Sequence, residues 1–396
     1  MHTTETEIVA LAQELLSHRY GGKQHLSEVH RLSGSGSGPA VVLRARLANQ
    51  PFLQQRSVVI KYVPGTGDGL DDAALLREVA AYQFTTSLSE EVRPGPMLIA
   101  HDVDKRVLVL SDSGEGTTLA QILEQRDPET RGRILRKLGV ALGRMHAGTA
   151  GKGDGFDVLL GRLLKAHPGL QEGGDMRENS IGPAIVIGLS LVESAGFDIP
   201  EEVRHLATEA GHQLTSERTS AFSPFDLSPD NIIVAEQVQF LDYEWAGFRD
   251  VFYDLACVIG GFPQFVGTRR IEDEETETFL RAWVDTVAQV WPSVTDTHQL
   301  QHRIAAALTG WALSSVAMLH HGSLTSALTA DDAASPDLLR PAHEGPFDAE
   351  EQLIRQDFHE TFDALARFAA GSGDPTHAVV ATFAAAVAER VDARER

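Results

Sequence analysis

The order of apolar and polar positions divides the chain into a strand-rich first part and a helix-rich remainder. Five short runs have the apolar, β-branched composition typical of strands and are separated by turn-rich pieces. These runs are residues 26–32, 41–47, 58–63, 97–101 and 107–110. Residues 4–18 and 71–88 have helical spacing instead. The pattern predicts five strands, with one helix before them and one between the third and the fourth.

After Ser111 the pattern becomes helical, beginning with a stripe of apolar residues between 135 and 145. Further helices are predicted at residues 182–195, 200–214, 274–291, 298–321 and 348–370. The exception is a pair of short apolar strands, 231–234 and 239–241, on either side of a turn. A short hairpin within a helical region suggests that its loop carries a function.

Composition indicates a globular protein, for which the cytoplasm is the default compartment. A chain of 396 residues with 42% apolar content is long enough for two packed lobes. Cys257 is the only cysteine, which excludes a disulfide framework and suits a reducing compartment. Residues 1–7 lack the features of a signal peptide, and the most apolar stretch, 181–192, is shorter than the roughly 20 residues that span a bilayer. We therefore expect a cytoplasmic protein without a membrane partner.

The formal net charge of −22 argues against nucleic acid as a partner, because the phosphate backbone would be repelled. The same charge would attract cationic small molecules. It could equally serve only to keep the surface soluble, and charge alone does not decide between these interpretations.

The motif with the clearest chemistry is Asp-x4-Asn, followed by the predicted hairpin and a second aspartate. Phosphoryl transfer needs an acceptor hydroxyl held in line and Mg²⁺ ions that bridge the phosphates. At this spacing Asp226 can orient the hydroxyl and accept its proton, while Asn231 and Asp242 can bind Mg²⁺. Asp-x4-Asn alone is common in turns. The hairpin that ends in Asp242 makes the combination more specific.

The run Leu241–Gly247 and the Asp254 that follows it resemble the metal-binding segments of the aminoglycoside phosphotransferase and choline kinase family. Their order relative to Asp-x4-Asn also matches. The resemblance implies that Asp226 is the catalytic base, that Asn231 and Asp242 hold Mg²⁺, and that Asp254 braces the catalytic loop. An ordinary helix N-cap is the alternative for Asp254.

The resemblance covers roughly residues 25–260 and implies an α+β, bilobal, protein-kinase-like fold. We expect an N-lobe at 1–110 with a five-stranded antiparallel sheet that clamps the nucleotide phosphates. A hinge at 111–116 would lead to a mostly helical C-lobe at 117–396, with the catalytic loop and the substrate site.

The residues before Asp226 depart from the family pattern. The family usually has His-Gly there, and often a histidine where this chain has Ser228, whereas this chain has Pro224 and Phe225. Pro224 can fix φ and Phe225 can pack beneath the loop, but neither supplies the hydrogen bond of an imidazole. A catalytically silent kinase-like binding protein therefore remains an alternative.

Two further groups of residues are predicted to bind the nucleotide. Lys61 ends an apolar strand and Glu78 lies on the next helix, the order in which kinases pair a lysine with a glutamate beside the phosphates. The resemblance places Asp112, Ser113 and Gly114 at the hinge, where backbone groups receive the nucleotide base.

A glycine and serine tract between the first two strands could bring backbone N–H groups over the phosphates, or could be only a flexible loop. Its first residues are Ser33, Gly34, Ser35 and Gly36. His298 and His302 are spaced as in a zinc protease but lack its glutamate, which favours a polar helix face.

The sequence thus predicts a small-molecule kinase that uses Mg²⁺ and ATP or GTP. The acceptor would be a hydroxylated small molecule, either an aminoglycoside or amino sugar, which would imply antibiotic resistance, or another alcohol such as a choline-like metabolite. Glu244, Asp250 and the acids within 348–363 are candidates to receive a cationic acceptor, or face solvent. The sequence does not indicate an oligomeric state.

Overall fold

The computed structural model describes residues 3–32, 40–48, 55–125, 127–265, 270–322, 324–329 and 337–392. The chain forms two compact units, each built from three segments. The sheet unit contains Met1–Leu119, Lys152–Arg177 and Asp230–Gly247. The helical unit contains Ala120–Gly151, Glu178–Pro229 and Phe248–Arg396.

The sheet unit contains the predicted five-stranded antiparallel sheet, in the order β1-β2-β3-β5-β4. Its strands are β1 (Leu26–Arg31), β2 (Val41–Leu47), β3 (Ser57–Tyr62), β4 (Leu98–Asp102) and β5 (Val107–Ser111). Helix α1 (Glu5–Tyr20) begins with a capping box at Thr4 and buries Ile8 against one face of the sheet, where Leu43 and Ile60 also lie. This apolar face forms the core of the unit.

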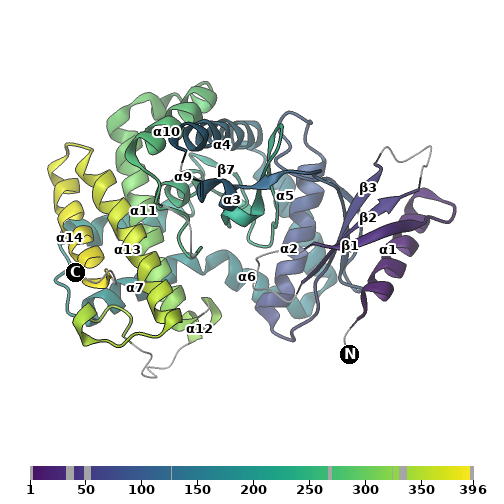
Figure 1. Cartoon of the computed structure of the whole chain (residues 1–396), viewed down its shortest axis with the longest axis horizontal. Coiled ribbons are helices and arrows are strands. Elements are labelled where there is room, and N and C mark those ends of the chain that lie inside the picture. Colours follow the sequence, from purple (N-terminus) through teal and green to yellow (C-terminus); the bar gives the residue numbers. More distant parts are fainter. Residues whose placement is uncertain are drawn as a thin grey trace. The chain divides into compact units, whose positions relative to one another are not determined.

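Side chains alternate along a strand, so Lys61 points away from the face that Ile60 shares with α1. Helix α2 (Gly69–Thr86) lies on this other side of the strands (Figure 1). It begins at Asp68, whose carboxylate accepts hydrogen bonds from the amides of Leu70 and Asp71. Because side chains alternate along β3, Lys61 points toward α2, a helix whose residues are mostly buried.

The helical unit is arranged around α11 (Thr297–His321), in which every residue from 304 to 317 is buried. A helix that is buried on all sides must be surrounded by others. Its helical neighbours include α7 (Ile181–Ser194), α8 (Glu201–Gln213), α9 (Phe252–Ile259) and α13 (Ala349–Ala370). A Cβ atom at Gly188 would lie 1.8 Å from the Leu313 carbonyl oxygen, so α7 and α11 touch backbone to backbone.

Two other helix pairs complete this unit: α4 (Pro128–Thr149) packs on α10 (Asp273–Val287), and α13 packs on α14 (Pro375–Val391). Other α-helices within the described residues are α3 (Leu119–Leu123), α5 (Gly153–Ala166), α6 (Gln171–Asn179) and α12 (Leu324–Thr329). Other strands in these ranges are β6 (Thr117–Thr118), β7 (Ser220–Ser223), β8 (Ile232–Val234), β9 (Val238–Phe240) and β10 (Gly247–Asp250).

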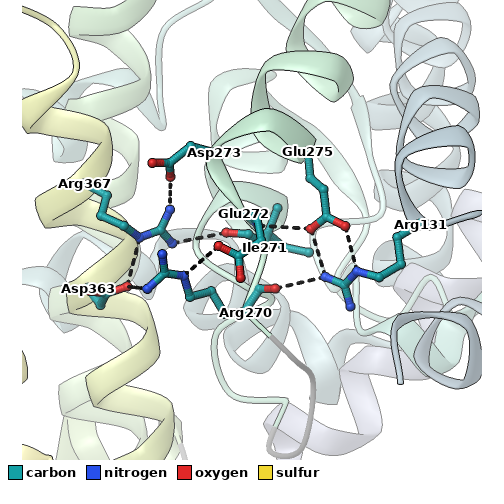
Figure 2. A network of polar contacts seen from close by, with 8 residues as sticks. All are labelled: Arg131, Arg270, Ile271, Glu272, Asp273, Glu275, Asp363 and Arg367. Atoms are coloured by element: carbon teal, nitrogen blue, oxygen red, sulfur yellow. Dashed lines mark hydrogen bonds and ion pairs between the residues drawn. The ribbon is translucent and has the colours of Figure 1, made fainter. Parts of the chain in front are cut away.

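Arginines from α4 and α13 hold the start of α10 (Figure 2). Arg131 of α4 forms two hydrogen bonds, of 2.6 and 2.9 Å, with the carboxylate of Glu275 and also donates to the Arg270 carbonyl. Arg367 of α13 donates to the Ile271 carbonyl at 3.1 Å. A planar guanidinium group can bond a carboxylate and a carbonyl at once. The two arginines therefore connect α4 and α13 to the start of α10.

The α+β class, the five-stranded antiparallel sheet and the mostly helical remainder are confirmed. The lobe boundary at 111–116 stays a prediction, and segments 152–177 and 230–247 belong to the same compact unit as the sheet. No helix within the described ranges is both long enough and apolar enough to cross a bilayer.

Candidate functional site

The hairpin β8–β9 brings two predicted metal ligands to the same end of a small sheet. The strands pair Ile232 with Phe240, and the Leu241 amide donates to the Asn231 carbonyl at 2.8 Å. The pairing therefore continues one residue beyond each strand. Asn231 and Asp242 therefore both lie at the open end of the hairpin.

Lys61 joins Glu78 to this hairpin. Its Nζ atom lies 2.7 Å from Oε1 of Glu78 and 2.8 Å from Oδ1 of Asp242. The side chains of Lys61 and Glu78 are 10% and 2% exposed, whereas that of Asp242 is 35% exposed. One buried ammonium group is thus shared by a buried carboxylate and a more accessible one.

This arrangement affects the acidity of both partners. Burial works against the charged form of Lys61, but the carboxylates of Asp242 and Glu78 outweigh it and hold the pKa of Lys61 above its ordinary value. Burial raises the pKa of Glu78 to about 7, although the nearby Lys61 opposes that shift. Lys61 therefore stays charged at neutral pH, whereas Glu78 gains or loses its proton close to neutral pH.

The oxygen donors of Asn231 and Asp242 suit Mg²⁺, which is usually bound through one or two carboxylates together with substrate phosphates. The carboxylate of Asp242 is accessible enough to meet an ion. Among the described residues, no group of three or more His, Cys, Asp or Glu side chains is placed to hold a metal.

The loop that carries Asp226 is a tight turn. The Asp226 amide donates to the Pro224 carbonyl at 2.8 Å, a three-residue γ-turn in which the central residue, Phe225, has φ 64°. The Ser228 amide donates to Oδ1 of Asp226 at 2.9 Å. The side chain of Asp226 is half-buried and is oriented by its own loop.

Phe225 occupies the left-handed region, which costs a residue other than glycine about 1–2 kcal/mol. Its side chain is 4% exposed and stacks on Trp311, with ring centroids 5.2 Å apart. The guanidinium of Arg249 lies 4.5 Å from the centre of the ring. A strained conformation persists where its surroundings fix it. Packing thus allows Phe225 to stand where the family usually has glycine.

A buried hydrogen-bond network also supports the loop that carries Asp226. The Phe225 amide donates to the hydroxyl of Ser223 at 2.9 Å, and this hydroxyl donates to Asp254 at 2.6 Å. The other oxygen of Asp254 lies 2.9 Å from Nε2 of His146. The indole N–H of Trp283 donates to Nδ1 of His146 at 3.0 Å, so Nε2 carries the proton that bonds Asp254.

This network gives Asp254 the bracing contacts that the resemblance implied. Val251 is the N-cap of α9, so Asp254 lies in the first turn of the helix and is not its cap. Sequence reasoning missed Ser223 and Trp283. The signal for Ser223 was its position three residues before Asp226, one residue earlier than the usual histidine.

The predicted hinge residues are held within the sheet unit. Oδ2 of Asp112 accepts hydrogen bonds from Arg44 at 2.5 Å and Ser57 at 2.6 Å, and Oδ1 accepts one from the Gly114 amide at 2.9 Å. Burial works to raise the pKa of Asp112, but these three bonds outweigh it and lower the pKa. Ser113 is half-buried. Nucleotide binding by Asp112, Ser113 and Gly114 stays a prediction.

The predicted phosphate loop, Ser33, Gly34, Ser35 and Gly36, lies outside the described residues. The interpretation of Asp250 as an acid that meets substrate or solvent is wrong, because its side chain is 0% exposed. Asp250 accepts a hydrogen bond from Thr219 at 2.8 Å and pairs with Arg303. Its partners had no signal in the sequence, because Arg303 lies 53 residues further along the chain.

Among the acids within 348–363, Asp357 is also buried, with one oxygen bonded to the Gln264 amide at 2.9 Å. Burial raises the pKa of Asp357 to about 7. Asp363 pairs with Arg270 and Arg367. Glu244 is 39% exposed and remains a candidate for contact with an acceptor.

No protein-family model matches this sequence. No curated protein matches it either.

Solved structures similar to this one include a choline/ethanolamine kinase family protein from Mesorhizobium loti, with 15% identity, TM-score 0.43 and coverage of 96% of this chain and 99% of that one. A choline kinase from Cryptosporidium parvum has 10% identity and TM-score 0.49, with coverage of 95% and 99%. An ADP-bound aminoglycoside phosphotransferase has 13% identity and TM-score 0.41, with coverage of 76% and 90%. These names belong to the family that the motif resembles, but identities and scores this low decide neither substrate nor mechanism.

Proposed function

We propose that the chain is a small-molecule kinase that transfers the γ-phosphoryl group of ATP or GTP to a hydroxyl group. The cluster of Lys61, Glu78 and Asp242 carries this proposal. A strand lysine paired with a helix glutamate, and a second carboxylate at a hairpin end, are the parts that kinases use around the nucleotide phosphates.

Each residue has a specific role in this proposal. Lys61 contacts the phosphates of the nucleotide, and Glu78 keeps the ammonium group in place. Asn231 and Asp242 would hold Mg²⁺, which would offset the negative charge of the phosphates. Asp226 orients the acceptor hydroxyl and accepts its proton as the oxygen bonds to the γ-phosphorus. The bond between the γ-phosphorus and the β–γ bridging oxygen breaks in the same step, and the nucleoside diphosphate leaves.

The loop before Asp226 favours an active enzyme over a silent binding protein. Phe225 has the positive φ that glycine would provide, and Ser223 links the loop to Asp254. The loop therefore has both a turn and a brace without the usual His-Gly.

The acceptor is a hydroxylated small molecule, and we propose that it is cationic, either an amino sugar or a choline-like alcohol. The net charge of −22 supports a cation, because an acidic surface raises the local concentration of positive ligands. The carboxylate of Glu244, two residues after Asp242, lies 3.5 Å from Nη2 of Arg177 but is 39% exposed, so it can also contact an ammonium group.

Mg²⁺-dependent turnover of ATP and GTP, measured against a panel of aminoglycosides, amino sugars and choline-like alcohols, tests the reaction. Asp226→Asn should lower kcat by about 10²–10⁴-fold, because the proton acceptor is lost. Asp230→Asn, in the same loop, is the matched control and should keep most of the activity. If Asp226→Asn phosphorylates an accepted substrate as fast as the parent, the role of Asp226 is overturned.

Nucleotide binding tests the metal ligands separately. Mg²⁺ with ADP should raise the melting temperature of the parent, and Asn231→Ala and Asp242→Ala should reduce that shift. If neither ADP nor GDP stabilises the parent in the presence of Mg²⁺, the kinase proposal fails.

A further inference from the structure

The turn Tyr243–Ala246, which directly follows Asp242, is bonded to two buried arginines of the sheet unit. Arg77 of α2 is 2% exposed and donates to the Ala246 carbonyl at 2.9 Å. Arg177 of α6 is 3% exposed and donates through Nε to the Glu244 carbonyl at 3.1 Å. Buried carbonyls need donors, so these arginines determine where the turn can lie.

Arg177 makes the larger set of contacts. Its Nη2 atom lies 3.5 Å from Oε1 of Glu244, and its guanidinium lies 3.6 Å from the centre of the Trp245 ring. Its Nη1 atom donates to the Leu70 carbonyl, in the first turn of α2, at 3.3 Å. A planar guanidinium can stack and donate in several directions at once, which an ammonium group cannot do. One side chain therefore ties the turn to α2.

The helix that carries Arg177 is itself fixed against α2. A Cβ atom at Gly173 would lie 2.1 Å from the Gly69 carbonyl oxygen, so the backbones of α6 and α2 are in contact at this point. Arg177 follows one helical turn later, on the same side of α6. Its guanidinium is thus held at a defined place beside the turn.

Asp242 depends on this support because of its own conformation. Its φ of 59° is in the left-handed region, where a residue other than glycine needs surroundings that impose the conformation. Before Asp242, the Leu241 amide is bonded to Asn231. After Asp242, the chain enters the turn that Arg177 holds. The direction of the carboxylate is therefore set from both sides.

We propose that Arg177 is a positioning residue for the metal-binding carboxylate of Asp242. It fixes the turn Tyr243–Ala246 against α2 and so sets the backbone from which Asp242 faces the ion. This inference rests on the proposed role of Asp242 as a Mg²⁺ ligand. Arg177 has no contact with the reacting atoms in this role and acts through Asp242 alone.

The test measures the metal dependence of ADP binding by calorimetry, with and without Mg²⁺. In Arg177→Met the affinity for Mg²⁺ in the presence of ADP should fall by about 10–100-fold, the usual effect of losing a partner that orients a metal ligand. The affinity for ADP without metal should stay within about threefold of the parent, because Arg177 does not contact the nucleotide in this proposal.

Arg355→Met is the matched control. Arg355 of the helical unit is also buried, donates to the carbonyls of Leu338, Arg340 and Arg390, and stacks on Phe347 at 3.9 Å. Its loss should lower the melting temperature as Arg177→Met does, while the Mg²⁺ affinity stays at the parent value. A merely structural role for Arg177 predicts the same result for both variants.

Arg177→Lys provides a second variant if the methionine variant does not fold. Lysine keeps the positive charge but lacks the planar guanidinium group that donates in several directions and stacks on Trp245. The Mg²⁺ affinity of Arg177→Lys should therefore lie between those of the parent and Arg177→Met. A folded variant of either kind with the Mg²⁺ affinity of the parent overturns the inference, while parental ADP binding leaves the kinase proposal intact. A parent that binds no nucleotide overturns both.

Discussion

Phe225 and Asp242 both have a positive φ, of 64° and 59°, but different contacts surround them. Phe225 lies in the helical unit, and its ring is stacked on Trp311. Asp242 lies in the sheet unit, and its carboxylate is bonded to the ammonium group of Lys61. Aromatic packing surrounds Phe225, whereas Asp242 belongs to an ion cluster and is followed by the turn that Arg177 holds.

The difference teaches that a strained backbone can be stabilised by interactions that fail under different conditions. Aromatic packing does not depend on protonation, so the stacking of Phe225 on Trp311 should persist across a wide pH range. An ion cluster depends on the charge of each member. The hairpin end at Asp242 should therefore respond to pH through Glu78, whose pKa is about 7.

Lys61→Met should have the largest effect of the predictions on this comparison. It leaves the buried carboxylate of Glu78 without its cation, and breaking a buried pair in this way costs about 3–5 kcal/mol. Urea unfolding should show the larger loss at pH 8 and a smaller one at pH 6, where Glu78 can take up a proton. In the parent, Lys61 keeps its charge at both pH values, because its pKa is held above the ordinary value.

Lys105→Met is the control for this experiment. Lys105 pairs with Glu14 on the surface of the same unit, and its side chain is 38% exposed. Such surface pairs contribute about 0–1 kcal/mol, so its loss should be small. An equal loss of stability at pH 6 and pH 8 in Lys61→Met would show that Glu78 does not titrate in this range.

Ser223→Ala should have an intermediate effect, now on the region held by packing. It removes the acceptor of the Phe225 amide and a donor to Asp254, and unsatisfied buried groups cost about 1–3 kcal/mol. Thermal unfolding should show this loss, and kcat should fall because the loop of Asp226 is less fixed. Ser220→Ala in the same strand, β7, should change neither; a parental kcat in Ser223→Ala would contradict the bracing role.

The comparison of Phe225→Gly with Phe225→Ala should give the smallest effect and isolates the strain. Both variants lose the ring, but only glycine adopts a positive φ without cost. The free energy of unfolding of Phe225→Gly should therefore be about 1 kcal/mol higher than that of Phe225→Ala. At Phe222, in strand β7, the order should reverse, because glycine weakens a strand. The same order at both positions would mean that Phe225 is not strained.

Much of the fold follows from local patterns in the sequence. The strands of the sheet have continuous or alternating apolar residues, and the hairpin around Asn231 and Asp242 has two apolar runs separated by a short turn. The pairing of Lys61 with Glu78 was also predicted, from the order of strand and helix in which kinases pair a lysine with a glutamate. These features are encoded by residues that are close together in the sequence, or by the regular spacing of apolar residues in a strand or a helix.

The rest depends on contacts that no local pattern encodes. Ser223 braces the loop from one residue before the usual histidine, through a hydrogen bond from the amide of Phe225, whose φ is 64°. The fixed position of Arg177 depends on Gly173 meeting Gly69. The polar helix α6, with two adjacent glycines, has no apolar stripe that would have indicated its packing against α2.

The hydrogen bond from Trp283 to His146 gives the protein a spectroscopic reporter. Because Nδ1 of His146 is an acceptor, its ring proton sits on Nε2, buried between the imidazole and the carboxylate of Asp254. A proton in this position exchanges slowly with water and resonates far downfield in an NMR spectrum. Among the 16 histidines of the chain, this signal would report whether the support beneath the Asp226 loop is intact.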